Sequence, residues 1–305
     1  MAFPDTSENA PLIRQATIAS IFVALILICA KAIAWQKTGS LSIMASMVDS
    51  LLDAAASTIN FFAVSYSLRS ADDDHRFGHG KAEYLAGLGQ ALFIGASALF
   101  IIARAIDRVL HPQPLETTSV GIAVMLFAVV LTALLVLFQR HAVKQTGSTA
   151  IKADSLHYAT DLFTNLGTIG ALVLAGMGWS GWDPFIGMAI ALLVLYSAWQ
   201  IATEALQNLM DSRLPFEIEE QVRNLALANP RVLGVHDIRT RRSGQVQMIQ
   251  LHLELAGETS LEQAHRTAKE VEVAIREVLP MADLIIHQDP VITSDNRLEV
   301  PVEKI

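Results

Sequence analysis

The sequence has almost no cysteine, since Cys29 is the single one in 305 residues. One cysteine excludes a disulfide within the chain and any metal site built from thiolates. Charge is also scarce, at 17% of residues with a net charge of −8, so there is no basic surface of the kind that binds nucleic acid. The HExxH motif of metalloproteases is absent and no nucleophile–base pair stands out, which argues against an enzyme.

What the chain has is apolar residues, at 52% of the sequence and with a mean hydropathy of +0.41. Soluble domains rarely reach such values. The apolar residues are concentrated before Asp211, and charge is dense after it. This asymmetry predicts an N-terminal cytoplasmic arm (1–13), a transmembrane domain (14–211) and a cytoplasmic domain (212–290). The end, 291–305, has little apolar pattern, which is typical of a disordered tail.

Six apolar runs are long enough to cross a bilayer as helices. They are 15–35, 41–68, 84–110, 119–138, 151–177 and 184–210. They predict an all-α, six-helix transmembrane bundle. Basic residues gather in the loops after the second and fourth runs: Arg69, Arg76, Lys81, Arg140, Lys144 and Lys152. The positive-inside rule then places both termini in the cytoplasm.

The segment after Asp211 reads as an α+β domain with the order αββαβ. Helices are expected at 217–228 and after Ser260, which with Gln263 forms a capping box. Strands are expected at 232–240, 249–255 and 284–288. Apolar and polar residues alternate strictly along 249–255, so one face of this strand should be buried and the other exposed.

Two pairs of metal-ligand residues interrupt the apolar runs. Asp49 and Asp53 stand at i and i+4 in the second run, and His157 and Asp161 repeat that spacing in the fifth. Residues at this spacing project from one helix face. A carboxylate in hydrocarbon is costly, by at least ~2.5 kcal/mol, unless it meets a cation or water. A single Asp could pair with a lysine or a hydroxyl, but two matched pairs favour a four-ligand site for a divalent metal.

Two further clusters have ligand chemistry. The loop after the second run contains Asp72, His75 and His79, whose spacing suits Zn²⁺ or a similar ion, although an acidic loop can also be simply solvated. The cytoplasmic domain carries four histidines and an acid on consecutive elements, which predicts a second metal site outside the membrane. These residues are His236, His252, His265, His287 and Asp289.

Taken together, these motifs resemble the cation diffusion facilitator family, and most closely its bacterial zinc- and iron-exporting members. The resemblance extends over residues 12–290 and includes the loop sequence DDDHRFGHGKAE (72–83). It implies a transport site of Asp49, Asp53, His157 and Asp161, a loop site of Asp72, His75 and His79, and a binuclear cytoplasmic site of the five residues named above. It also implies a Lys81–Asp211 salt bridge that anchors the dimer, and a metallochaperone-like cytoplasmic domain.

The resemblance further implies a homodimer in the bacterial inner membrane that exports Zn²⁺ in exchange for H⁺, with Cd²⁺ and Fe²⁺ as alternative ions. Its partners would be the lipid bilayer, divalent metal ions and protons, with no nucleic acid. His157 favours a borderline ion over a hard one. The residues leave open an exporter of Mn²⁺ or Fe²⁺ and a metal-gated channel or sensor. They also leave open whether the cytoplasmic metal is regulatory or structural.

Overall fold

The structure, a computed structural model, describes residues 10–38, 41–111, 119–176 and 183–291. The chain divides at Asp211 into two compact units. Most of the expected N-terminal arm, and the end 292–305 that we expect to be disordered, lie outside the described residues.

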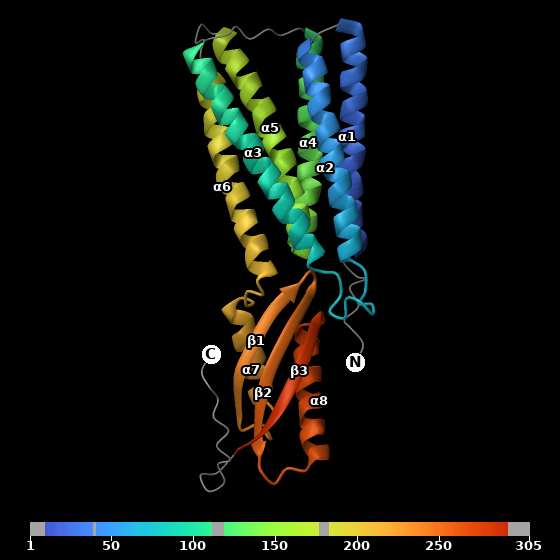
Figure 1. Cartoon of the computed structure of the whole chain (residues 1–305), viewed down its shortest axis with the longest axis vertical. Coiled ribbons are helices and arrows are strands. Elements are labelled where there is room, and N and C mark those ends of the chain that lie inside the picture. Colours follow the sequence, from blue (N-terminus) through green and yellow to red (C-terminus); the bar gives the residue numbers. More distant parts are fainter. Residues whose placement is uncertain (1–9, 39–40, 112–118, 177–182, 292–305) are drawn as a thin grey trace. The chain divides into compact units, whose positions relative to one another are not determined.

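The first unit consists of six long helices, shown in Figure 1. They are α1 (Ala10–Thr38), α2 (Leu41–Ser67), α3 (Ala82–Leu110), α4 (Ser119–Thr146), α5 (Thr149–Gly176) and α6 (Asp183–Leu209). Each helix overlaps one of the expected apolar runs. Two of them extend beyond their run by more than a turn: α4 continues past residue 138 to Thr146, and α1 begins at Ala10 in the segment expected to form the arm. Ile13 in that segment is fully buried against Val64 and Ala150, which explains why the helix starts early.

Four of these helices, α1, α3, α4 and α6, are long and apolar enough to cross a membrane. Helices α2 and α5 are of similar length but carry the polar residues of the predicted metal site. The surface of the unit is apolar, with Phe22, Phe62 and Trp199 each more than 60% exposed. Its interior holds buried polar groups. This inverted distribution is expected where lipid surrounds the helices and their polar groups must be satisfied inside the bundle.

Small residues bring the helices of this unit together. Helix α3 packs along α6 through Ile94, Ala98, Val194 and Ala198. Alanine at the contact lets two helices approach closely in a membrane. A separate apolar cluster joins α1, α4 and α5, and it includes the buried Tyr158 next to His157. The packing therefore fixes α5, the helix that carries the HxxxD pair.

The second unit is the expected αββαβ domain. Its elements are α7 (Phe216–Leu227), β1 (Gly234–Ser243), β2 (Val246–Ala256), α8 (Leu261–Val278) and β3 (Ala282–Val291). Strand β2 is central, antiparallel to β1 and parallel to β3. Ser260 caps α8 by accepting a hydrogen bond from the backbone N–H of Gln263, as its sequence position predicts.

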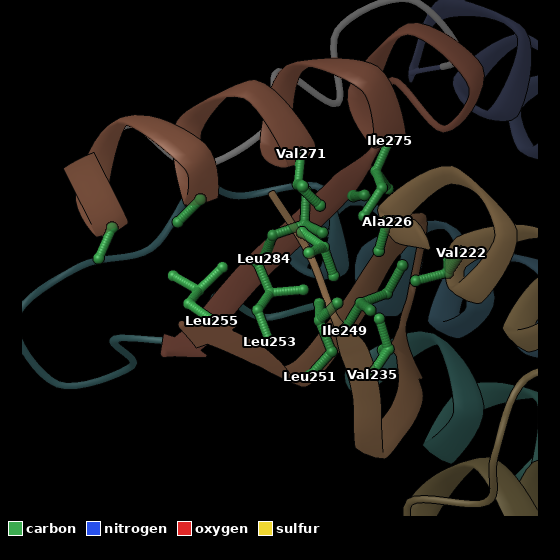
Figure 2. Close-up of a cluster of buried hydrophobic side chains, with 14 residues drawn as sticks. Val222, Ala226, Val235, Ile249, Leu251, Leu253, Leu255, Val271, Ile275 and Leu284 are labelled. Carbon is green, nitrogen blue, oxygen red and sulfur yellow. The ribbon is translucent and has the colours of Figure 1, made fainter. Parts of the chain in front are cut away.

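Both helices of this unit cover the same face of the sheet. Figure 2 shows Leu251 and Leu253 of β2 facing Val271 of α8 and Val222 of α7. All four side chains are at most 1% exposed. Because successive side chains of a strand point to opposite faces, His252 and Glu254 lie on the face that the helices leave uncovered.

Candidate metal sites

The membrane unit brings together three of the four predicted transport ligands. Nε2 of His157 on α5 lies 2.9 Å from Oδ1 of Asp53 on α2 and 3.9 Å from Oδ2 of Asp161. One ligand atom from each of the three residues lies within 4.8 Å of the others. His157 is buried and its two partners are partly buried. Nitrogen and carboxylate oxygens at this separation can converge on one divalent ion.

Asp49, the fourth predicted ligand, is not part of this close group. It lies one turn before Asp53 on α2 and its side chain is exposed. Its charge still interacts with those of Asp53 and Lys31. The structure therefore places Asp49 beside the three ligands and not among them.

Lys31 on α1 is a neighbour of this site that the sequence analysis did not identify. Its ammonium group donates hydrogen bonds to the carbonyl of Ser46 at 2.9 Å and to Oγ of Ser50 at 2.7 Å, both on α2. Its charge interacts with those of Asp53, Asp161 and Asp49. A lysine inside an apolar run is the signal that could have revealed it, because such a charge needs a partner in the bundle.

Asp154 forms a second buried group that sequence reasoning missed. It is 1% exposed and accepts hydrogen bonds from Ser20 of α1 at 2.5 Å, Gln90 of α3 at 2.9 Å and Gln139 of α4 at 2.6 Å. Three neutral donors satisfy one carboxylate and join four helices. Asp154 lies one turn before His157 on α5, so this network fixes the helix at the metal site.

The loop between α2 and α3 brings together the three residues of the second candidate site. Asp72 lies 3.2 Å from Nε2 of His79 and 3.4 Å from Nδ1 of His75. The backbone N–H of His75 donates to Asp72 at 2.7 Å and holds the pKa of that carboxyl below its usual range, so Asp72 is ionised at neutral pH. Gly78 permits the turn with a φ of 74°. His79 is buried and its ring packs against that of Tyr66 in a T-shaped arrangement.

In the second unit the histidines form a row across the sheet. His236, His252 and His287 are register partners on β1, β2 and β3. Asp289, two residues after His287, lies 2.8 Å from Nδ1 of His252 and 3.3 Å from Nε2 of His236. Its other oxygen is 3.1 Å from His287. One carboxylate thus touches three imidazoles, an arrangement that suits a carboxylate bridge between two ions.

Glu254 also belongs to this cluster, although the sequence analysis did not assign it. Its carboxylate lies 3.0 Å from Nδ1 of His236, whose Nε2 faces Asp289. Gly234 is the register partner of Glu254, and a Cβ there would lie 2.2 Å from the Glu254 carboxylate. The sequence pattern that could have assigned Glu254 to this cluster is its i, i+2 spacing from His252, which places both residues on one face of the strand.

His265 is not joined to this row within one chain. It is exposed on α8, which packs against the opposite face of the sheet.

The predicted Lys81–Asp211 pair joins residues of the two separate units. Lys81 donates to the carbonyl of Leu209 at 3.3 Å, and Asp211 accepts from Arg241 at 3.0 Å. Their direct salt bridge stays a prediction.

Comparison with known proteins agrees with this pattern of sites. Residues 17–210 match the cation efflux transmembrane domain and residues 214–291 match the cytoplasmic domain of cation efflux proteins. The chain is 46% identical to the cation-efflux pump FieF of Citrobacter koseri, over 92% of this chain and 93% of that protein. It is 45% identical to FieF of Salmonella arizonae over the same shares. A solved structure of CzrB in its Zn form is 36% identical over 27% of this chain and 93% of that one, with a TM-score of 0.26.

A helical membrane unit with candidate metal ligands on facing helices, followed by a small α+β domain, together with the two matching family domains, defines a cation efflux transporter. The chain belongs to the cation diffusion facilitator family.

Proposed function

We propose that this protein exports Zn²⁺ from the bacterial cytoplasm across the inner membrane in exchange for H⁺. The observation that carries this proposal is the contact between His157 and Asp53 at 2.9 Å, with Asp161 beside them. A hydrogen bond between these two atoms contains one proton, whichever group carries it. A metal ion that binds Nε2 of His157 needs the lone pair on the same nitrogen, so metal and proton exclude each other there.

The ligand chemistry favours Zn²⁺. One imidazole with two or three carboxylates suits a borderline ion better than a hard ion such as Mn²⁺. Cd²⁺ and Fe²⁺ have overlapping preferences and are the alternative substrates. Asp49 is one turn from Asp53, and its rotation toward a bound ion would supply the fourth ligand. Efflux of divalent cations also agrees with the names of the FieF relatives.

The transport path requires all six long helices to cross the membrane. Helices α2 and α5 carry the ligands and pack among the four clearly apolar helices, so their polar side chains face the bundle. Basic residues after α2 and at the end of α4 favour an orientation with these ends, and both termini, in the cytoplasm. Alternating exposure of the site to the two sides would follow from movement of helices around it.

The cytoplasmic unit is the second part of the proposal, as a dimerisation module held by metal. His236, His252, His287 and Asp289 lie on the uncovered face of the sheet. His265 lies across the sheet, so it can reach such a cluster from a second copy of the chain. A shared site of this kind, and the cytoplasmic domain model that residues 214–291 match, support a homodimer.

Replacement of Asp53 by Ala tests the transport site. In proteoliposomes that contain the purified protein, Asp53→Ala should abolish Zn²⁺ flux, because it removes a ligand and the proton-sharing partner of His157. Asp72→Ala is the matched control, since it removes a carboxylate from the loop cluster and should keep most of the flux. Undiminished Zn²⁺ flux in Asp53→Ala would contradict the proposed site.

A further inference from the structure

A pocket of about 370 Å³ between α4, α5 and α6 contains none of the candidate metal ligands described above. Each helix lines it with one face, from residues three and four apart in sequence. On α4 these are Arg140, Val143 and Lys144, and on α5 they include Lys152, Leu156 and Ala159. Its lining residues lie near the end of α4 and near the start of α5. These two helix ends meet at one end of the bundle (Figure 1).

The polar end of this pocket has an excess of positive charge. Arg140, Lys144 and Lys152 line it, and Glu204 of α6 forms an ion pair with Lys152. Within the part of the chain that the structure describes, no acidic side chain pairs with Arg140 or Lys144, and both are exposed. Two cations held side by side without counter-ions favour an anionic ligand.

The remainder of the lining is mixed, with the apolar Val143, Leu156, Ala159 and Ile201 beside the polar Ser155, Ser197 and Gln200. Leu156, Ala159 and Ile201 form its walls deeper in the bundle. One turn before Arg140 on α4, Leu137 is 64% exposed, and Tyr196 on α6 is 62% exposed. A ligand with a negative head and an apolar chain would satisfy both ends of the pocket.

We propose that this pocket binds an anionic phospholipid of the membrane. The headgroup phosphate would contact Arg140 and Lys144, and one acyl chain would lie against Leu156 and Ile201. Basic pockets between membrane helices bind anionic headgroups in this way. A free phosphate ion would use the charged end alone and leave the apolar walls unfilled. A second copy of this chain would bring its own excess of negative charge but no acyl chain.

Native mass spectrometry of the full-length protein tests this proposal. The protein is released from micelles with equimolar phosphatidylglycerol and phosphatidylcholine, and the bound lipids are counted. The wild-type protein should retain phosphatidylglycerol preferentially. Arg140→Gln with Lys144→Gln should lower this retention by roughly tenfold, because each basic group contributes to headgroup binding. Arg69→Gln is the matched control, since Arg69 is an exposed cation at the same end of the bundle but outside the pocket.

Further arms separate the possible occupants. Ser197→Phe fills the pocket from α6 without a change in charge, and it should also reduce retention. Inorganic phosphate at millimolar concentration should not displace the lipid. Equal retention in the double variant and in Arg69→Gln would overturn the proposal, because the attraction would then be spread over the surface. Displacement by phosphate alone, or dissociation of a dimer in the double variant without loss of lipid, would overturn it as well.

Discussion

Lys31 places a positive charge beside the carboxylates of the candidate transport site. Its ammonium group is held near these carboxylates by hydrogen bonds to Ser46 and Ser50. Asp49, Asp53 and Asp161 all interact with its charge. The lysine therefore reduces the attraction of the site for a divalent ion, which favours release as much as it opposes binding.

Replacement of Lys31 by Gln should tighten metal binding. Removal of one positive charge beside a divalent ion should lower the Kd for Zn²⁺ by on the order of tenfold. Because release then becomes slower, turnover should fall. Isothermal titration gives the Kd and proteoliposome flux gives the turnover. Lys37→Gln, at the exposed end of the same helix, is the control and should change neither. A Kd that is unchanged or weaker in Lys31→Gln would show that the lysine is only a structural partner of α2.

At the scale of single residues, the sequence predicted site residues where two of them formed a pair with a recurring i, i+4 spacing. Asp53, His157 and Asp161 were predictable because i, i+4 pairs recur in two apolar runs. Lys31 and Asp154 were not, because one polar residue in an apolar run carries no spacing that points to a partner. Ser20, Gln90 and Gln139 come from three other helices, and only the packing of those helices brings them to Asp154.

At the scale of the strands, the register across the sheet creates the cytoplasmic cluster. The alternation along β2 predicted which face of the strand carries His252, and the structure confirms it. The pairing itself was not predictable, because β1 has an irregularity between His236 and Arg239 and β3 pairs in parallel after a helix. Glu254 was missed for this reason, since only the register places it beside His236.

Gly234→Ala should weaken metal binding by the cytoplasmic cluster. The new Cβ would meet the Glu254 carboxylate at 2.2 Å, and this flexible side chain would move away from Nδ1 of His236. When a metal-binding histidine loses the hydrogen-bond partner of its second ring nitrogen, the metal affinity of the site typically falls tenfold or more. Zinc titration of the full chain in an Asp53→Ala, Asp72→Ala background isolates this cluster.

Gly257→Ala is the matched control for this change. It directly follows β2, the strand that carries Glu254, and a Cβ there has its nearest neighbour at 3.7 Å, an ordinary contact. Thermal unfolding should be similar in the two variants, because only Glu254 has to move. Equal zinc affinity in both variants would remove Glu254 from the site.

At the scale of the whole molecule, the proposed homodimer explains why His265 is separated from the other histidines. A ligand on α8 cannot reach across its own sheet, but a second copy can present it. Acidic residues are frequent in this unit, so two copies should repel each other until a metal ion neutralises the interface. The sequence alone contained these candidate ligands, but only the fold shows that His265 is separated from the others and leads to their proposed division between two chains.

Zinc should therefore shorten the distance between the two cytoplasmic units of a dimer. A spin label on Glu220→Cys, an exposed position on α7, reports this distance in a Cys29→Ser background. Pulsed electron resonance should show a shorter distance after zinc addition, and His287→Ala should reduce the change. If the distance changes neither with zinc nor with chelator, the cluster is a permanent structural link and does not respond to cytoplasmic metal.

The most direct test of the central claim is a simultaneous record of Zn²⁺ and H⁺ movement in proteoliposomes. The account predicts that Zn²⁺ entry drives H⁺ out, that an imposed pH gradient changes the rate of Zn²⁺ flux, and that Asp53→Ala abolishes both movements. These results follow if one proton and one metal ion compete for the contact between His157 and Asp53. Zinc flux that proceeds at the same rate without any proton movement would contradict antiport and favour a channel.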